Sequence, residues 1–140
     1  MAETVRFHFD VDGDNFASAG DASIQIKKVL RQLGFTPDII RRVSIAMYEG
    51  EINMVIHADG GDADVLVDDD KITIVLADRG PGIADIDLAM QAGYSTAPDD
   101  VRSLGFGAGM GLPNMKKNTD EMHIESTVGV GTTVTMIVNL

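Results

Sequence analysis

The amino-acid sequence predicts an α+β fold, a two-layer α/β sandwich in which helices cover one face of a mixed, mostly antiparallel sheet. Two observations support this class. Segments with the two-residue apolar period of strands follow one another as hairpins, and the helical segments stand apart from them instead of alternating with single strands. The chain has 140 residues, of which 44% are hydrophobic and 24% charged, as in an ordinary globular domain. We therefore expect residues 1–140 to form a single domain.

One strand and two helices are expected in the first part of the chain. Residues 5–11 alternate between apolar and polar side chains, which is the period of a half-buried strand. Residues 21–33 carry apolar side chains at helical spacing among lysine and arginine, as in an amphipathic helix. After Gly34, Thr36 and Pro37 supply an N-cap and a first-turn proline, which predict the start of a second, long helix.

The long helix is expected to reach about residue 58 and to be closed by Gly60 and Gly61. Strands at 63–67 and 71–77, separated by three consecutive aspartates, predict a hairpin. The remaining expected elements are a short helix at 85–92, a long loop that ends in a glycine-dense segment at 105–111, a helix at 112–118 and closing strands at 122–126 and 132–138.

The composition excludes several classes of function. There is no cysteine, so disulfides, thiolate metal sites and thiol nucleophiles are excluded together. No segment resembles a membrane span or a signal peptide, so we expect a soluble, cytoplasmic protein without a membrane partner. Acidic residues outnumber basic ones 22 to 11, and the net charge of −11 would repel nucleic acids. Any bound phosphate must therefore be held mostly by backbone N–H groups or a metal ion.

The first candidate group lies on the long helix. Glu49 and Asn53 are four residues apart and stand together on one flank of its apolar stripe, whereas Glu51 lies on the other flank. A carboxylate beside an amide oxygen could supply a general base and a ligand for Mg²⁺, which prefers oxygen donors. The alternative is a solvated helix face without chemistry.

The second candidate group follows the apolar strand 71–77. Asp78 ends that strand, and Gly80, Gly82 and Ile83 come directly after it. A carboxylate in this place can accept a hydrogen bond from a neutral donor such as an exocyclic amine, and the glycines let a flat ring approach the backbone. The same residues are also ordinary turn formers.

The third candidate group is the glycine-dense segment, in which four of the seven residues 105–111 are glycine. Leu112 and Pro113 follow it and begin a helix, so the backbone N–H groups and the positive end of a helix dipole can bind an anion. No Lys-Ser/Thr pair follows the glycines, so the segment is not a P-loop, and the dinucleotide-binding pattern fits poorly. A flexible hinge is the alternative.

Taken together, these three groups resemble the N, G1 and G2 boxes of the Bergerat ATP-binding domain that gyrase and histidine kinases share. Glu49-x-x-x-Asn53 resembles the N box, Asp78-x-Gly80-x-Gly82 the G1 box and Gly107-x-Gly109-x-Gly111 the G2 box, and Gly129 to Val134 are similar to the last motif of the family. Within that superfamily the chain most closely resembles the bacterial anti-sigma-factor serine kinases and the switch kinases of stress-response modules.

The resemblance implies an ATP site with Mg²⁺. Glu49 would be the catalytic base, Asn53 would bind Mg²⁺ and Asp78 would accept the adenine amine. Residues 93–111 would form a mobile lid, and Thr132 would approach adenine together with Asp78. The nucleotide-binding residues implied in this way are Asn53, Asp78, Gly80, Gly82, Ile83, Arg102, Gly107, Ala108, Gly109, Met110, Gly111, Leu112 and Thr132.

Two features depart from the family pattern. Gly50 stands inside the N-box helix, where glycine costs about 1 kcal/mol relative to alanine. Ile56 precedes His57 where a basic residue could help with phosphate. Arg102, the only basic side chain of the expected lid, could compensate by reaching the γ-phosphate, or it is simply exposed. The chain's three histidines, His8, His57 and His123, show no ligand spacing, so we assign them no metal.

The leading functional hypothesis is a protein-serine kinase that transfers the γ-phosphoryl group of Mg-ATP to a small antagonist protein and thereby switches partners, one of which would be a sigma factor or another regulator. The alternative is a nucleotide-sensing module that sequesters such a regulator without useful catalysis, and a homodimer is a further candidate assembly. The detached catalytic domain of a histidine kinase fits less well, because residues 1–35 are too few to hold a phosphoacceptor hairpin as well as the first strand and helix.

Overall fold

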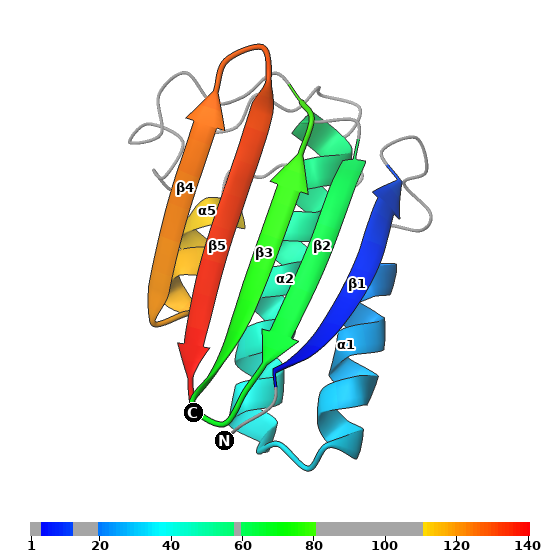
Figure 1. Ribbon diagram of the computed structural model, residues 1–140, viewed down its shortest axis with the longest axis vertical. Coiled ribbons are helices and arrows are strands. Elements are labelled where there is room, and N and C mark those ends of the chain that lie inside the picture. The colour runs from blue at the N-terminus through cyan, green and yellow to red at the C-terminus, as the bar shows by residue number, and fades with distance from the viewer. Residues whose placement is uncertain (1–3, 13–19, 58–59, 81–110) are drawn as a thin grey trace.

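The computed structural model describes residues 4–12, 20–57, 60–80 and 111–140. Within these ranges, five strands form one sheet in the order β1-β2-β3-β5-β4, and the helices lie against one of its faces (Figure 1). The elements are β1 (Val5–Asp12), α1 (Asp21–Gln32), α2 (Pro37–His57), β2 (Gly60–Val67), β3 (Lys71–Asp78), α5 (Gly111–Lys117), β4 (Glu121–Thr127) and β5 (Gly131–Asn139).

Alternation of side chains along the strands creates the face that binds the helices. In β3 and β5 every second residue is buried over most of the strand, as expected for a strand with one covered face. Each aliphatic side chain buried in this way contributes about 1.5–3 kcal/mol. The largest fully buried side chains come from the helices and from β2, β3 and β5: Ile26, Leu30, Val43, Met47, Val65, Ile72, Ile74, Met115, Met136 and Val138.

The predicted elements that fall within the described residues are confirmed, with ends that differ by a few residues. The sheet differs in one respect from the expectation, since every pairing among the described strands is antiparallel and none is parallel. The reason is that β2 and β3, and likewise β4 and β5, form hairpins, and the two hairpins join through the antiparallel pair β3 and β5. The helix expected at 85–92 and most of the long loop lie outside the described residues.

Gly60 and Gly61 belong to β2 and do not merely close α2. Gly61 pairs with Asp78 in the neighbouring strand. A Cβ atom at Gly61 would clash with the carbonyl oxygen of Ala77 and would lie 2.8 Å from Cε of Met54. Only glycine lets the start of β2 fit between the end of β3 and α2.

Packing explains why glycine occupies position 50 inside α2, which the sequence could not reveal. It lies on the buried side of α2, where an added Cβ would clash with Cδ1 of Leu76 and would lie 3.2 Å from Cε of Met115. The glycine therefore admits side chains from β3 and α5 against the helix. The helix-propensity cost of about 1 kcal/mol is offset by this close approach.

Most of the buried apolar side chains of the described helices and strands belong to one cluster. That residues 1–140 form a single domain stays a prediction. None of the described helices is both long enough and apolar enough to cross a membrane.

Candidate functional site

The face of the sheet that meets the helices ends in a polar row. Ala77 pairs with Thr133 and Ser126 pairs with Thr132, so Asp78, Thr132 and Ser126 are cross-strand neighbours on one face. Every other inward-facing residue of these three strands is apolar: Ile72, Ile74, Leu76, Met122, Ile124, Val134, Met136 and Val138. A polar row next to an apolar core indicates a site for a ligand with a flat apolar body and a polar edge.

Asp78 is held by two backbone N–H groups. The amides of Gly80 and Thr132 each donate to its Oδ1 atom at 3.0 Å, and the side chain is half-buried. Both hydrogen bonds that the described residues make to this carboxylate end on Oδ1, so Oδ2 keeps its acceptor capacity for a ligand. The carboxylate is thereby oriented before any ligand arrives.

Thr132 reaches Asp78 because Gly131 precedes it. A Cβ atom at Gly131 would clash with the carbonyl oxygen of Asp78 and would lie 3.2 Å from Cα of Arg79. The backbone of β5 can therefore begin directly against the end of β3. Thr132 itself is buried, and its hydroxyl oxygen lies 2.8 Å from the hydroxyl oxygen of Ser126.

Glu49 and Asn53 lie half-buried on α2, and both contact α5. The side-chain amide of Asn114 donates to Oε1 of Glu49 at 3.4 Å, a long hydrogen bond. The side-chain amide of Asn53 donates to the sulfur of Met115 at 3.9 Å. No hydrogen bond from the described residues reaches the side-chain oxygen of Asn53, and an amide oxygen is a suitable ligand for the predicted Mg²⁺.

The N box and the polar row lie at the same end of the molecule. In Figure 1, α2, β3 and β4 end and β5 begins at the upper edge of the sheet. Met54 follows Asn53 on α2 and lies close to Gly61, which pairs with Asp78. The structure therefore brings Glu49 and Asn53 to the end of the sheet that carries Asp78 and Thr132.

Part of the predicted site cannot be placed. Gly80 is buried beside Asp78, Gly111 begins α5, and Leu112 packs partly buried against the core. The other members lie outside the described residues: Gly82, Ile83, Arg102, Gly107, Ala108, Gly109 and Met110. The expected lid at 93–111 falls almost wholly in the same range.

Glu51 has a structural role that sequence reasoning missed. It is only 3% exposed, and its carboxylate accepts hydrogen bonds from the backbone N–H groups of Gly20, Ala22 and Ser23 at 2.9–3.1 Å. Gly20 is the N-cap residue of α1 and offers no side chain, so the carboxylate from α2 caps the helix instead. The lack of a capping side chain before residue 21 was the only sequence signal.

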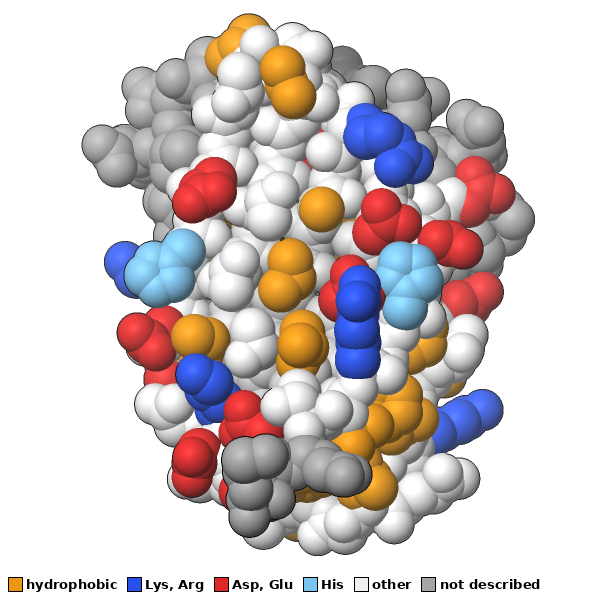
Figure 2. All heavy atoms as spheres, viewed as in Figure 1, with side chains coloured by type: hydrophobic (Ala, Val, Ile, Leu, Met, Phe, Trp, Pro, Cys, Tyr) orange, Lys and Arg blue, Asp and Glu red, His pale blue; other side chains and the backbone are white. Residues whose placement is uncertain are grey.

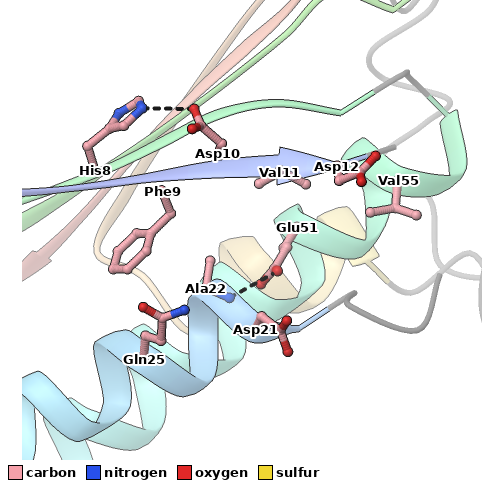
Figure 3. A pocket seen from close by; sticks show the side chains of 10 residues that line it. All are labelled: His8, Phe9, Asp10, Val11, Asp12, Asp21, Ala22, Gln25, Glu51 and Val55. Carbon is pink, nitrogen blue, oxygen red and sulfur yellow. Dashed lines mark hydrogen bonds and ion pairs between the residues drawn. The ribbon is translucent and has the colours of Figure 1, made fainter. Parts of the chain in front are cut away.

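A cavity of about 330 Å³ lies between β1 and the start of α1 (Figure 3). Its lining includes the acidic residues Asp10, Asp12, Asp21 and Glu51. Four carboxyl groups would repel phosphate, and the lining contains none of the residues that the sequence predicted for nucleotide binding. The nucleotide site that the sequence predicts therefore does not coincide with this cavity.

The uncovered face of the sheet carries a network of charges near β1 and β2 (Figure 2). Nδ1 of His8 lies 2.7 Å from Asp64, and Nε2 lies 3.1 Å from Asp10. Hydrogen bonds to Asp64 and then to Asp10 raise the pKa of His8. Burial opposes the shift at Asp64, yet the hydrogen bonds from His8 and Arg6 lower the pKa of that carboxyl.

Three side chains of this network each place one atom that could bind a metal ion within 4.8 Å of the others: His8, Asp10 and Asp62. This proximity across two strands was not visible in the sequence. His8 and Asp10 are exposed, and Arg79 lies 3.7 Å from Asp62. Because basic side chains already accompany these carboxylates, we interpret the group as a surface charge network and assign it no metal.

Comparison with known proteins identifies the family. A family model described as the histidine kinase-like ATPase domain matches residues 17–138. The anti-sigma F factor of Caldanaerobacter subterraneus is 36% identical over 110 residues, which cover 75% of this chain and 73% of the relative. That of Geobacillus thermodenitrificans is 32% identical over 140 residues, which cover 96% and 90%. The chain belongs to the histidine kinase-like ATPase domain family, and its relatives there include the anti-sigma F factors.

Solved structures support the same fold. The RsbU and RsbW domains of a Mycobacterium tuberculosis protein match with a TM-score of 0.66 at 18% identity over 96% of this chain. The present chain spans 32% of that longer one. The mycobacterial sensor histidine kinase MprB matches with a TM-score of 0.54 at 17% identity, over 96% of this chain and 97% of its own. The expected Bergerat fold is thus confirmed, and the relatives named above confirm the expected resemblance to anti-sigma factors.

Proposed function

We propose that this protein is a protein-serine kinase that transfers the γ-phosphoryl group of Mg-ATP to a small antagonist protein, and that this transfer makes it exchange that antagonist for a sigma factor or another regulator. The observation that carries the proposal is the position of Glu49 and Asn53 at the sheet edge where Asp78 and Thr132 form a polar row. The anti-sigma F factor relatives support the regulatory part of the proposal.

The adenine base would bind at the polar row. Oδ2 of Asp78 would accept the exocyclic amine, while Oδ1 stays on the amides of Gly80 and Thr132. The inward apolar side chains of the neighbouring row, Leu76 and Val134, are buried there and would exclude water from the ring. The glycine-rich segment before α5 is the proposed phosphate-binding element, because the net charge of −11 provides no general attraction for phosphate.

Phosphoryl transfer requires mainly positioning and charge neutralisation. Asn53 would hold Mg²⁺, which when bound neutralises charge on the phosphates. Glu49 would take the proton of the serine hydroxyl. The hydroxyl oxygen would then form its bond to the γ-phosphorus as the bond to the β,γ-bridging oxygen breaks, so that phosphoserine and ADP are the products.

The experiment that tests this proposal separates binding from chemistry with Glu49→Ala. We expect Mg-ATP affinity, measured by calorimetry, to stay within a few-fold, because Glu49 does not touch the adenine or hold the metal. The rate of transfer of labelled γ-phosphate to an antagonist that copurifies with the chain should fall by about 10²-fold, the usual scale for a general base. The matched control is Glu121→Ala, which removes an exposed glutamate on β4 and should leave both quantities unchanged.

Two outcomes would contradict the kinase proposal. Equal transfer rates for Glu49→Ala and the parent chain would remove the assigned base. ATP binding with no label transferred to a copurifying partner, even by the parent chain, would instead support a nucleotide-sensing module that sequesters its partner.

A further inference from the structure

A general base must present one oxygen to the substrate hydroxyl from a fixed direction, because proton transfer needs hydrogen-bond geometry. A glutamate side chain carries its carboxylate on three rotatable bonds, and Glu49 is only half-buried on α2. A second group that holds this carboxylate would therefore raise the fraction of molecules that are ready to react. Enzymes that activate a hydroxyl with a base commonly orient that base with a third residue.

Asn114 on α5 is placed to hold the Glu49 carboxylate. Its side-chain nitrogen lies 3.4 Å from Oε1 of Glu49, and both side chains are half-buried. An ionised carboxylate only accepts hydrogen bonds, so the nitrogen and not the oxygen of the Asn114 amide faces it. The contact is long, as catalytic hydrogen bonds often are before substrate binds. Among the described residues no other donor reaches this carboxylate, so Oε2 can accept the substrate hydroxyl.

Both members of the predicted N box contact α5, which lies behind β4 and β5 in Figure 1. Asn114 contacts Glu49, and the sulfur of the next residue, Met115, accepts a hydrogen bond from the Asn53 amide at 3.9 Å. Met115 is only 1% exposed, and its Cε atom lies close to Gly50 on α2. Packing of α5 against α2 thus fixes the position from which Asn114 approaches the base.

The backbone of α5 is also held at the other end of the helix. The side-chain amide of Asn118 donates to the carbonyl oxygen of Asn114 at 2.8 Å. Nε of Arg42, on α2, donates to the carbonyl oxygen of Asn118 at 3.1 Å, and the same guanidinium lies 3.2 Å from Asp120. The Asn114 side chain therefore starts from a fixed backbone, and its amide can restrict the Glu49 carboxylate at little further cost in entropy.

We propose that Asn114 is a positioning residue for phosphoryl transfer, because its side-chain N–H group holds Oε1 of Glu49 and thereby aims Oε2 at the serine hydroxyl of the substrate. Asn114 acts through Glu49 and is not itself a base. In the sequence, α5 follows directly on the glycine-rich segment proposed for phosphate binding, so the helix that ends this segment would also carry the group that orients the base. This inference rests on the proposed function, since it takes Glu49 as the base.

The test compares Asn114→Leu, which removes the N–H donor, with Asn114→Gln, which keeps it on a side chain one methylene longer. Leucine and glutamine both favour helix more than asparagine does, so neither variant should unfold α5. The measurements are the single-turnover transfer of labelled γ-phosphate to saturating copurified antagonist, and Mg-ATP affinity by calorimetry. For Asn114→Leu we expect the transfer rate to fall about 10-fold or more, with affinity within about twofold. Asn114→Gln should stay within about threefold of the parent rate, because its amide can still donate.

Two controls show whether Asn114 acts through Glu49. In a Glu49→Ala background, Asn114→Leu should slow the transfer no further, since no carboxylate is left to orient. Lys117→Gln changes an exposed side chain on the same helix, and it should leave the transfer rate and the affinity unchanged. An additional loss of rate in the Glu49→Ala background would show that Asn114 supports the site in another way, and this would overturn the inference.

The remaining outcomes separate this inference from the proposed function. If Glu49→Ala slows the transfer but Asn114→Leu keeps the parent rate, the inference fails alone. It also fails alone if Asn114→Leu and Asn114→Gln lose rate equally, or if the loss of rate is matched by a loss of ATP affinity, because the shape of the side chain would then matter and not its donor. If the parent chain transfers no label, or Glu49→Ala transfers it at the parent rate, the proposed function fails and this inference fails with it.

Discussion

At the scale of single residues, the two oxygens of Asp78 have different tasks. Oδ1 accepts the N–H groups of Gly80 and Thr132 at 3.0 Å and holds the end of β3 against the start of β5. Oδ2 accepts no hydrogen bond from the described residues, and we propose that it binds the ligand. One carboxylate therefore joins two parts of the fold and offers an oriented acceptor, and a substitution can separate the two tasks.

The substitution Asp78→Asn should keep the structural role of this side chain and remove its proposed role in binding adenine. The asparagine oxygen can keep both backbone N–H bonds, while its amide presents a donor where the adenine amine also donates. We expect ATP affinity to fall about 5- to 150-fold, which corresponds to 1–3 kcal/mol for an unmet buried polar contact, with little change in the urea midpoint of unfolding. If calorimetry shows that Asp78→Asn binds ATP as tightly as the parent chain does, Asp78 does not bind the adenine base.

His8 provides a prediction about pH. Hydrogen bonds to Asp64 and Asp10 raise its pKa above the ordinary histidine value of 6.5. A raised folded-state pKa stabilises the protein fully below the unfolded-state pKa, and this stabilisation is lost as the pH rises through the folded-state value. We expect His8→Gln to lower the urea midpoint at pH 5.5 and to change it much less at pH 9. A midpoint difference that does not depend on pH would show that the imidazolium is not stabilising.

At the scale of elements, the packing of α2 depends on a position without a side chain. Leu76 of β3 and Met115 of α5 both approach Gly50. Replacing an interior helical glycine with alanine normally stabilises a helix by about 1 kcal/mol. Here the added methyl group would clash with Leu76, so we expect Gly50→Ala to destabilise the protein instead.

We expect Gly50→Ala to lower the free energy of unfolding by about 1–3 kcal/mol, as overpacking of a core does. Gly50→Ala should cost less in a Leu76→Ala background than in the parent chain, because the shorter side chain removes the clash. Urea denaturation of both variants and of Leu76→Ala alone measures the coupling. A Gly50→Ala variant that is more stable than the parent would contradict the packing argument.

The contrast between Glu49 and Glu51 shows what the sequence could predict about these elements. Apolar periodicity located the helices and strands, and the helical repeat correctly placed Glu49 and Glu51 on different flanks of α2. It could not show that Glu51 caps α1 or that Gly50 admits Leu76, because both depend on the approach of elements distant in the sequence. Ser126 was missed for the same reason, since only the register of β4 and β5 places it beside Thr132.

At the scale of the whole molecule, the proposed nucleotide site lies where the two hairpins of the sheet meet. Asp78 comes from the hairpin of β2 and β3, and Thr132, which is 54 positions further along the chain, comes from that of β4 and β5. A ligand held by both residues binds only the folded chain, so it should stabilise the whole molecule. The expected size at 100 times the dissociation constant is about 2.7 kcal/mol.

This stabilisation should appear as one cooperative shift of the thermal midpoint with Mg-ATP. The Asp78→Asn variant at the same nucleotide concentration should shift less, because it binds less. If saturating Mg-ATP does not move the thermal midpoint of the parent chain, the proposed nucleotide site is contradicted. If the midpoint of Asp78→Asn shifts as much as that of the parent chain, the nucleotide binds elsewhere.

The contact between the two hairpins also determines the stage of folding at which the proposed nucleotide site forms. Each hairpin can form from neighbouring residues, but the contact between β3 and β5 closes a long loop, and such non-local pairing is slow. Asp78 and Thr132 meet only after that step. If the nucleotide binds at the proposed site, binding becomes possible only late in folding, and a newly made chain whose two hairpins have formed but not yet joined would not bind ATP.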